Sequence, residues 1–329
     1  MKNAYLFEIN DIIANQIKLP YSTGLIWSYC ILNEEIKNNY DLAGWFYYRE
    51  DQEDILAKVK DSHFIGFNCF VWNYKYNKQV AEEIKRRYPD CIIVFGGWQQ
   101  PIADRSQGFF EEHPYVDIIV HGEGEIAFEE ILVEALKDKP DWKSITGCSV
   151  PNEDRTTFVT PPRARIADID AMPRPYLDGL FDELLEKADH DYALESTIET
   201  TRGCPYSCTF CEIGTKYYSR VKRQSFEKVK KEIDWISDHK VEFIYNFGMF
   251  PEHLDITRYM VDKKKETGYP GKHRCDWAKN KGDKVIPLAK IFTEADMDNG
   301  ITIALQSMNP KVLKAIKRQN IDSGKLEHF

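Results

Sequence analysis

The sequence predicts an α/β protein in two parts: a doubly wound parallel sheet, followed by a partial βα barrel. Three observations predict this fold. Short runs rich in Ile, Val and Phe alternate with amphipathic stretches in two separate regions of the chain. A proline-rich segment lies between these regions. At 329 residues, the chain is long enough for two domains that each bury a core.

The first region, residues 1–140, has the alternation expected of βαβ units on a parallel sheet. Apolar runs such as "FIGFNCFVW" and "CIIVFGG" are separated by helical patterns such as "KQVAEEIKRRY". Ligands of such Rossmann-like sheets bind beyond the carboxyl ends of the strands, where glycine lets the backbone approach them. We expect the loops at 20–24, 69–73, 96–101 and 121–125 to lie at that edge.

Residues 141–190 contain "VPNEDR", "TPPRAR" and "MPRPYLDG", and we expect an extended connector there. The second alternating region, residues 191–329, predicts four βα units. The expected strands are 194–201, 241–248, 273–278 and 301–307, and the expected helices are 225–239, 253–266, 286–299 and 310–319. Four units form only part of a barrel, whose chemistry would lie at the carboxyl ends of its strands.

The chain ends soon after the fourth expected unit. A part-barrel of that size leaves an exposed strand edge, which proteins usually avoid. We therefore expect a truncated chain or a shortened relative of a larger protein.

Composition narrows the classes of function. The formal net charge of −9 argues against a nucleic-acid surface, and no apolar run approaches the roughly 20 residues of a membrane span. The first residues, "MKNAYLFEIND", lack the pattern of a secretory signal, so we expect a cytoplasmic, reducing environment. Disulfides are then not expected, which leaves metal binding, catalysis or burial for the eight cysteines.

Three cysteines, Cys204, Cys208 and Cys211, occupy one short loop after the first strand of the second region. Thiolates hold iron–sulfur clusters, and this spacing allows one loop to wrap a four-iron cluster. Three ligands on four irons leave one iron open to a substrate. Structural zinc is the alternative, but it needs four ligands, so Cys275 or His273 would have to complete the site. Chance burial of three thiols is the third interpretation.

The segment "RGCPYSCTFC" resembles the cluster loop of the radical S-adenosylmethionine (SAM) enzymes. "CEIG", "NFGMF" and "LQSMNPKVLKAIKRQNI" look like segments of the cobalamin-binding branch of that family, and "GFNCFVWN", "FGGWQQP" and "GEGE" look like its N-terminal domain. The resemblance implies that Cys204, Cys208 and Cys211 hold a 4Fe–4S cluster whose open iron binds SAM. Phe210 fills the family's aromatic position, which packs near the adenine.

Four further residues are implied as SAM contacts. Asn246 and Gly248 stand where the family binds the SAM amino group, although the acidic residue often found there is absent. Gln306 and Ser307 follow the fourth expected strand, where the family commonly contacts the ribose or carboxylate. For each of the four, the alternative is a strand-terminal residue that caps a turn.

Residues 61–66, "DSHFIG", match the D-x-H-x-x-G signature of proteins that bind cobalamin through a histidine. That histidine should open a helix after the first strand, whereas His63 precedes a later strand, so we reject the match. The resemblance instead implies cobalamin with its lower base detached and side chains or water facing the cobalt.

The loops at the carboxyl edge of the first sheet would then hold the corrin, and Trp72, Trp98 and Trp27 are candidate apolar walls. For any single aromatic residue, core packing is the alternative. The candidate cobalamin contacts are Tyr21, Ser22, Gly24, Cys69, Val71, Trp72, Gly96, Gly97, Gly122, Glu123 and Gly124.

The resemblance implies an enzyme that cleaves SAM reductively to a 5′-deoxyadenosyl radical. That radical would take a hydrogen atom from an unactivated carbon, which methylcobalamin would then methylate. A radical rearrangement or cyclisation without methyl transfer is the alternative, and a non-catalytic iron–sulfur or cobalamin-binding protein is another. The implied partners are a small-molecule substrate and a one-electron reductant such as flavodoxin or ferredoxin, with no nucleic acid and no membrane.

Overall fold

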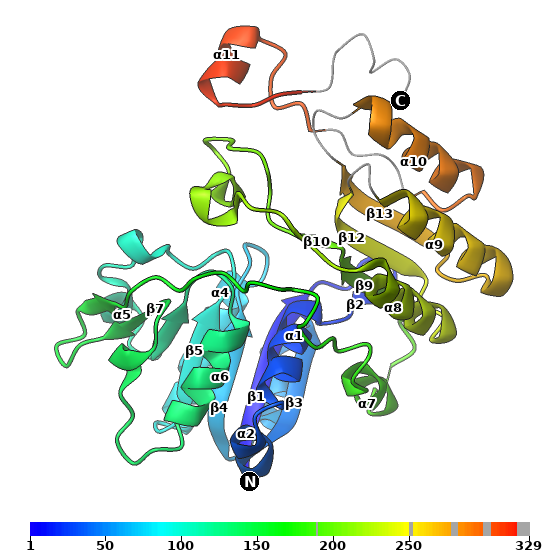
Figure 1. Ribbon diagram of the computed structural model, residues 1–329. Helices are drawn as coiled ribbons and strands as arrows, with labels where there is room; N and C mark the ends of the chain where they lie inside the picture. The colour runs from blue at the N-terminus through cyan, green and yellow to red at the C-terminus, as the bar shows by residue number, and fades with distance from the viewer. Residues whose placement is uncertain (189, 250–252, 278–281, 299–303, 321–329) are drawn as a thin grey trace. The chain divides into compact units, whose positions relative to one another are not determined.

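The structure is a computed structural model that describes residues 1–188, 190–249, 253–277, 282–298 and 304–320 (Figure 1). Contacts divide the chain into two compact units. The first comprises residues 1–166 and 173–190, and the second comprises residues 167–172 and 191–329. Each unit is built around its own sheet, so we describe them separately.

The first unit contains a seven-stranded sheet in the order β3-β1-β4-β5-β6-β7-β8. The first five strands in this order run parallel, and β7 and β8 are antiparallel to their neighbours. The prediction of a parallel sheet for this region is confirmed. The strands are β1 (Lys2–Asn10), β3 (Tyr40–Tyr48), β4 (Ser62–Asn68), β5 (Ile92–Gly96), β6 (Ile118–Val120), β7 (Cys148–Pro151) and β8 (Thr157–Val159).

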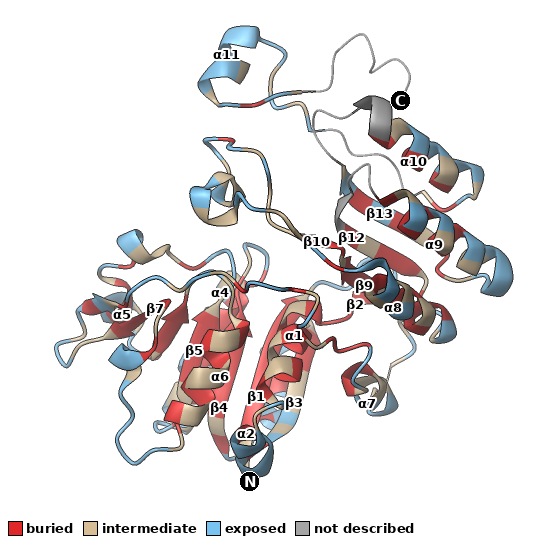
Figure 2. Ribbon diagram, viewed as in Figure 1, coloured by how far each residue is buried: buried red, intermediate tan, exposed pale blue. Residues whose placement is uncertain are grey.

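Helices cover both faces of this sheet, because side chains alternate along each strand. Phe7 and Ile9 of β1 pack into one core with α3 (Gln52–Lys58), α4 (Tyr74–Arg87) and α5 (Phe109–Glu112). Ala4 and Leu6 of the same strand pack into the other core with α1 (Tyr21–Cys30), α2 (Glu34–Asn39) and α6 (Glu125–Glu134). Figure 2 shows the central strands buried between these layers. The doubly wound architecture is therefore confirmed.

Residues 148–159 differ from the prediction, because they form β7 and β8 of the first sheet rather than an extended connector. Strands of three and four residues are too short to produce a readable period. The rest of the first unit has short elements: β2 (Gln16–Lys18), η1 (Ala103–Arg105), η2 (Trp142–Ser144) and α7 (Leu180–Glu186).

The second unit contains three parallel strands in the order β13-β12-β9, the sheet of a partial barrel. They are β9 (Ala193–Glu199), β12 (Phe243–Met249) and β13 (Lys272–Trp277). The helices α8 (Phe226–Asp238), α9 (Leu254–Thr267) and α10 (Gly282–Glu294) connect or follow them. Three of the four predicted βα units are thus confirmed.

The fourth predicted unit differs from the expectation. Residues 301–303 lie outside the described residues, and residues 304–307 have no regular structure. The expected helix at 310–319 is only α11 (Pro310–Ala315), capped by the Asn309 side chain, which accepts hydrogen bonds from the Lys311 and Val312 N–H groups. Within the described part of the chain, no helix is long and apolar enough to cross a bilayer.

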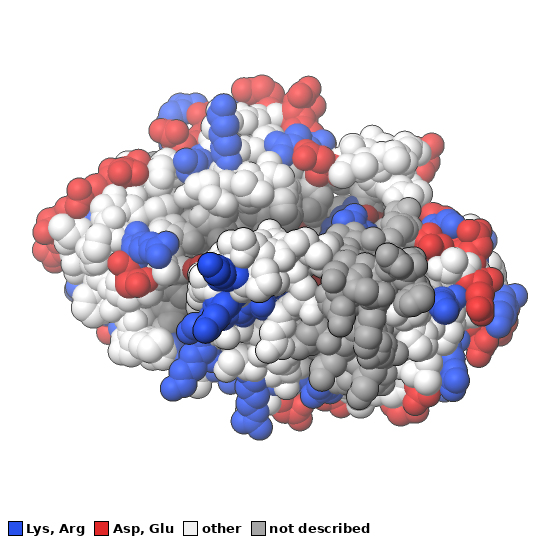
Figure 3. Space-filling model, turned by 90° about the horizontal axis from the view of Figure 1, so that it is seen from above, with Lys and Arg blue, Asp and Glu red and all other residues white. Residues whose placement is uncertain are grey.

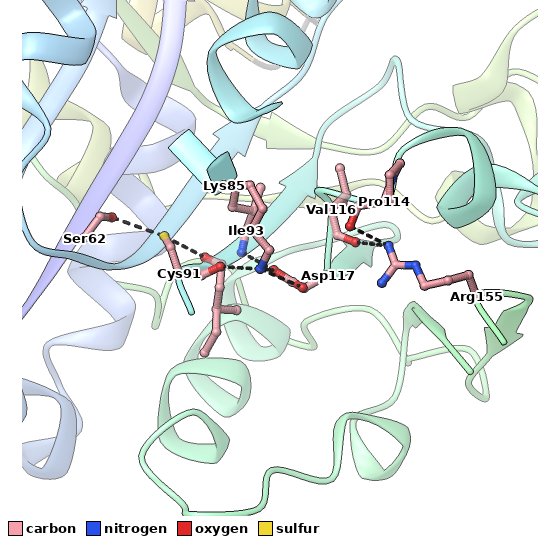
Figure 4. Close-up of polar contacts among 9 residues, drawn as sticks. Ser62, Lys85, Cys91, Ile93, Pro114, Val116, Asp117 and Arg155 are labelled. Carbon is pink, nitrogen blue, oxygen red and sulfur yellow. Dashed lines mark hydrogen bonds and ion pairs between the residues drawn. The ribbon is translucent and has the colours of Figure 1, made fainter. Parts of the chain in front are cut away.

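The amino ends of β4, β5 and β6 are joined by partly buried polar contacts, which include the contact of Ser62 Oγ on β4 with Cys91 Sγ (Figure 4). The Lys85 ammonium on α4 donates to the Asp117 carboxylate at 2.9 Å and to the Cys91 carbonyl at 2.7 Å. The Ile93 N–H donates to the same carboxylate at 2.8 Å. Burial raises the pKa of Asp117, and the Lys85 ammonium opposes that rise. His63 lies at this amino end too, at the start of β4. This position agrees with the prediction that His63 does not open a helix after a strand, as the cobalamin signature would need.

Replacing Lys85 should destabilise the first unit. The Lys85→Met variant removes the cation that donates hydrogen bonds to the Asp117 carboxylate, which we expect to reduce the free energy of unfolding by about 1–3 kcal/mol. Arg86→Met on the same helix is the matched control, because the Arg86–Glu83 pair is exposed and should contribute much less. Urea unfolding followed by circular dichroism measures both. Equal losses in the two variants would contradict this account.

Candidate functional site

The cysteine loop of the second unit is held by its own backbone. The Cys204 N–H donates to the Tyr218 carbonyl at 2.9 Å, and the Cys211 N–H donates to the Cys208 carbonyl at 3.1 Å. Two short helical turns, η3 (Glu212–Gly214) and η4 (Lys216–Tyr218), follow the last cysteine. The short strands β10 (Thr201–Arg202) and β11 (Lys222–Arg223) pair where the segment begins and ends. These contacts close residues 201–223 into one compact segment.

Gly214 lets this segment fold back on the middle cysteine. A Cβ atom at Gly214 would lie 2.4 Å from the Cys208 carbonyl oxygen and 3.0 Å from its nitrogen. These are backbone atoms, so the clash could not be relieved by rotating a side chain. The Gly214 N–H also donates to the Cys211 carbonyl at 2.9 Å. Position 214 therefore requires glycine for the loop to keep this shape.

The segment after α11 packs against the same loop. The Thr209 N–H donates to the Ile316 carbonyl at 3.1 Å. The buried Arg318 guanidinium lies 3.9 Å from the Cys208 sulfur, and its other nitrogens donate to Asn320 Oδ1 and the Ala304 carbonyl. The Arg318 side chain therefore ties the segment after α11 to the middle cysteine of the loop. Arg318 was not among the residues predicted from the sequence.

The donor set suits an iron–sulfur cluster. No disulfide joins any of the eight cysteines, and Cys208 is buried while Cys204 and Cys211 are partly exposed. Among the described residues, no three His, Cys, Asp or Glu side chains converge as ligands of one metal ion do. Cluster thiolates bind separate irons and need not converge so closely, so this arrangement is compatible with a cluster. The assignment of the three thiols as cluster ligands stays a prediction.

The zinc alternative placed His273 or Cys275 beside these cysteines. Both residues lie on β13 and are buried, and the His273 ring stacks on Phe292 of α10 with ring centroids 4.1 Å apart. Burial lowers the pKa of His273 to about 3. In this structure, both side chains pack in the core between β13 and its helices.

The predicted SAM contacts lie in different settings. Phe210 is exposed and Gly248 lies within β12. Gln306 has a backbone φ of +63°, in the left-handed region that non-glycine residues rarely adopt. The Ser307 side chain accepts a hydrogen bond from the Asn309 N–H at 3.1 Å, the turn-capping role weighed as the alternative.

Asn246 lies in the interior of the second sheet. It pairs with Ile198 on one side and Cys275 on the other, so its side chain shares their helix-covered face of the sheet. It is fully buried, and its Oδ1 accepts a hydrogen bond from Thr200 Oγ1 at 3.0 Å. Asn246 therefore links β12 to the chain entering the cysteine loop through Oδ1, its buried Nδ2 has no hydrogen-bond partner among the described residues, and its contact with SAM stays a prediction.

The opposite face of this sheet carries polar residues that the sequence analysis missed. Arg274 and Asp276 alternate with the buried His273 and Cys275 along β13 and are exposed. The Tyr245 hydroxyl on β12 donates to Asp276 Oδ2 at 2.8 Å, and burial is the main cause of its raised pKa. The alternation in "KHRCDW" was the signal that could have revealed this polar face.

At the carboxyl edge of the first sheet, apolar side chains are exposed in the predicted loops. Val71 is 75 % exposed, Trp72 48 % and Trp98 47 %. A Cβ atom at Gly96 would meet no atom within 4 Å, whereas one at Gly97, where φ is +92°, would meet Cys69 backbone atoms. Exposed aromatic side chains beside an open glycine suit a large flat ligand such as a corrin.

Three other residues predicted to contact cobalamin instead contact residues of the protein itself. Cys69 is fully buried, its sulfur accepting from the Asn77 amide, and burial raises its pKa to about 12. Tyr21 is buried and accepts a hydrogen bond from Arg174. A Cβ atom at Gly24 would lie 3.0 Å from the Pro175 side chain. Their side chains pack within the chain, so direct contact with the corrin is not supported.

Two more first-unit residues have structural contacts. The Ser22 N–H lies 3.4 Å from Glu8 Oε1, and Glu8 also accepts from the Thr23 N–H and hydroxyl, which fixes the start of α1. Burial is the main cause of the raised pKa of Glu8. Trp27 packs in the core formed with α6, so the idea that it forms a corrin wall is wrong.

The loop after β6, residues 121–124, contains two glycines and two side chains with hydrogen-bond partners. Gly122 has φ of +76°, and Gly124 precedes α6. The Glu123 carboxylate accepts from Arg165 Nε at 3.0 Å and from the Ile166 N–H. His121 Nε2 lies 2.7 Å from Ser149 Oγ on β7. Glu123 therefore fastens the loop to the following chain, and the glycines remain the predicted ligand contacts.

Comparisons with known families agree with this division. The radical SAM superfamily model matches residues 198–323, and the B12 binding domain model matches residues 44–132. The chain belongs to the cobalamin-binding radical SAM enzymes. Radical SAM domains carry a 4Fe–4S cluster and SAM, and B12 binding domains carry cobalamin, so these are the cofactors of this radical SAM chain.

Two curated relatives resemble nearly all of this radical SAM chain. It is 36 % identical over 311 residues to the cobalamin-dependent radical SAM methyltransferase TokK of Streptomyces tokunonensis, covering 92 % of this chain and 45 % of TokK. Identity is also 36 % over 310 residues with the 2-(S-pantetheinyl)-carbapenam-3-carboxylate methyltransferase of Streptantibioticus cattleyicolor, at the same coverage. The chain thus spans about half the length of these relatives.

Solved structures share the fold. The cobalamin-dependent SAM radical enzyme OxsB superposes with a TM-score of 0.67 and 21 % identity, over 99 % of this chain and 46 % of OxsB. The radical SAM methyltransferase TsrM of Kitasatospora setae gives a TM-score of 0.61 and 14 % identity, over 100 % of this chain and 64 % of TsrM. At these identities the likeness concerns the fold alone.

Replacing Gly214 tests the shape of the cysteine loop. The Gly214→Ala variant places a Cβ against the Cys208 backbone and should shift that cysteine, so we expect a clear loss of iron per chain after anaerobic reconstitution. Thr215→Ala, at the exposed next position, is the matched control and should retain its iron. Iron and sulfide analysis measures both variants. Full iron content in Gly214→Ala would refute the steric argument.

His121 should make the first unit sensitive to acid. Burial lowers its pKa to about 4, below the usual value of roughly 6.5. Its neutral form is therefore favoured in the folded state, and its contribution to stability is complete above about pH 6.5 and falls as the pH drops towards 4. His121→Asn lacks this titration. The stability difference between wild type and variant, from urea unfolding of the cofactor-free protein, should shrink between pH 7 and pH 4; a constant difference would contradict the assignment.

Proposed function

We propose that this protein transfers a methyl group to an unactivated carbon of a small-molecule substrate, using SAM, a 4Fe–4S cluster and cobalamin. The observation that carries the proposal is the 36 % identity, over 92 % of this chain, with two proteins named as methyltransferases. The cysteine loop of the second unit and the exposed aromatic edge of the first unit support it, because each suits one of the two metal cofactors.

Each cofactor is assigned to residues of one unit. Cys204, Cys208 and Cys211 would hold the cluster, with Arg318 beside the Cys208 sulfur and Phe210 exposed next to the last cysteine. In the first unit, Val71, Trp72, Trp98 and the glycines at 96, 97, 122 and 124 would contact the corrin. When bound, the cluster supplies an electron for SAM cleavage and cobalamin supplies the methyl group.

The polar face of the second sheet is the proposed substrate surface. The Tyr245–Asp276 hydrogen bond fixes two polar groups on this face, and Arg274 offers an exposed guanidinium beside them. Arginine recognises carboxylates and phosphates through paired hydrogen bonds. We therefore propose that the substrate carries an anionic group, which Arg274 holds. The carbapenam carboxylate in the name of one relative belongs to such a class.

The cellular setting forms part of the proposal. The cysteines are not joined by disulfides, which favours a reducing compartment, and we propose the cytoplasm. A cluster that gives up one electron per turnover needs a one-electron donor, and a flavodoxin or ferredoxin would supply it.

Cyclisation without methyl transfer is the second candidate. It is favoured by 26 % identity, over 53 % of this chain, with an anaerobic magnesium-protoporphyrin IX monomethyl ester cyclase of Synechocystis. The identity and the coverage are both lower than for the methyltransferases, so methyl transfer ranks first.

Product analysis separates the candidates. Anaerobic incubation with SAM, reductant, cobalamin and a candidate carboxylate substrate should yield 5′-deoxyadenosine, S-adenosylhomocysteine and a product heavier by one methylene. Deoxyadenosine without S-adenosylhomocysteine would favour cyclisation. The absence of both products would contradict both candidates.

Replacing Arg274 tests the substrate surface. The Arg274→Met variant should raise the KM for an anionic substrate about tenfold or more while the cluster spectrum stays unchanged, since a hydrogen bond to a charged group contributes about 1.5–3 kcal/mol. Arg274→Lys should recover part of that loss, because it restores the charge without the planar guanidinium. A KM unchanged in Arg274→Met would remove this residue from substrate binding.

A further inference from the structure

Charge is distributed unevenly in this chain. The whole sequence has a formal net charge of −9. Residues 200–224, which contain the cysteine loop, carry five Lys or Arg side chains and one carboxylate. Residues 304–320, which contain α11, carry four Lys or Arg side chains and no carboxylate. Two short basic segments thus stand out in an acidic protein.

Both basic segments contact the cysteine loop. The Cys204 N–H bonds to the Tyr218 carbonyl, which holds the chain around Lys216 and Arg220 against the loop. In the other segment, the Ile316 carbonyl accepts a hydrogen bond from the Thr209 N–H, and the Arg318 guanidinium contacts the Cys208 sulfur. These two contacts hold the segment that contains α11 against the cysteine loop. Segments separated by about a hundred residues therefore place their cations around one loop.

Six of these cations are exposed, and we refer to them as the basic collar: Lys216, Arg220, Arg223, Lys311, Lys314 and Lys317. Figure 3 looks down from the side on which α11 lies in Figure 1, and Lys and Arg side chains gather near the middle of that view. Lys311 and Lys314 are one helical turn apart on α11, so they project from neighbouring positions.

The form of the collar suits a large anionic partner better than a small anion. A small phosphate or carboxylate is usually held in a concave site by convergent, partly buried donors. Here the cations are exposed and spread over two segments. Exposed cations separated in this way act by long-range attraction and by pairing with carboxylates across a protein interface.

We propose that the basic collar docks an acidic one-electron carrier protein of the flavodoxin class. The inference rests on the proposed function, which requires that an electron reach the cluster held by this loop. In the step, the reduced carrier loses one electron and the oxidised cluster gains it, with no bond made and no proton transferred. Docking at the collar brings the carrier to the loop that holds the cluster ligands.

The test compares two triple variants with the same change in net charge. Lys311→Gln, Lys314→Gln and Lys317→Gln together remove half of the collar. Lys231→Gln, Lys265→Gln and Lys290→Gln together remove exposed lysines of α8, α9 and α10 and serve as the control. None of these six side chains is placed in the cofactor or substrate machinery.

The first measurement is binding of oxidised flavodoxin by calorimetry at low ionic strength. The collar variant should bind about tenfold more weakly than wild type, and the control within about twofold, because steering and pairing depend on local charge. The affinity of wild type should fall steeply with added salt, and that of the collar variant much less. Equal affinities of the two variants for flavodoxin overturn the proposal. It is also overturned if the protein does not bind flavodoxin but binds a single-stranded RNA that the collar variant binds more weakly.

The second measurement is the rate of cluster reduction in the reconstituted protein, followed by absorbance. Reduced flavodoxin should reduce the collar variant about tenfold more slowly than the control, while the small cation reduced methyl viologen should reduce both at similar rates. Equal rates with flavodoxin overturn the proposal. A wild-type protein that forms no cluster contradicts the proposed function instead, and the calorimetric result then decides the collar on its own.

Discussion

The close packing of Gly214 on the backbone of Cys208 is the constraint on which the site depends. With no Cβ at position 214, the chain after the last cysteine turns back and contacts the middle cysteine directly. Contacts from Tyr218 and Ile316 then fix the loop from both sides. These backbone contacts fix the main chain of the loop that carries the three cysteines, so that part of the chain is ordered without a bound cluster.

Each unit leaves a different surface open. In the first unit, helices cover both faces of the sheet, and the exposed side chains in the loops at its carboxyl edge include Val71, Trp72 and Trp98. In the second unit, His273 and Cys275 pack towards the helices while Arg274 and Asp276 alternate with them on the exposed face. A flat apolar ring suits the first surface and a polar small molecule suits the second.

The sequence predicted the elements whose patterns are long. α4 has a clear helical period, β4 and β5 are short apolar runs, and the cysteine spacing is local, so these could be read without knowledge of the fold. The sequence did not reveal which side chains near the expected edge pack within the protein. Cys69, Tyr21 and Gly24 lie near the expected edge of the sheet, but packing against Asn77, Arg174 and Pro175 turns them inward. The face of the sheet that carries Asn246 could not be read from the sequence, because only its pairing with Ile198 and Cys275 shows it.

One measurement tests the central claim that three thiolates hold a four-iron cluster with one iron open to SAM. Mössbauer spectra of protein reconstituted with iron-57 should show four irons per chain, one of which changes its isomer shift when SAM is added. A spectrum that SAM leaves unchanged, or protein that holds zinc in place of iron at these cysteines, would contradict the account.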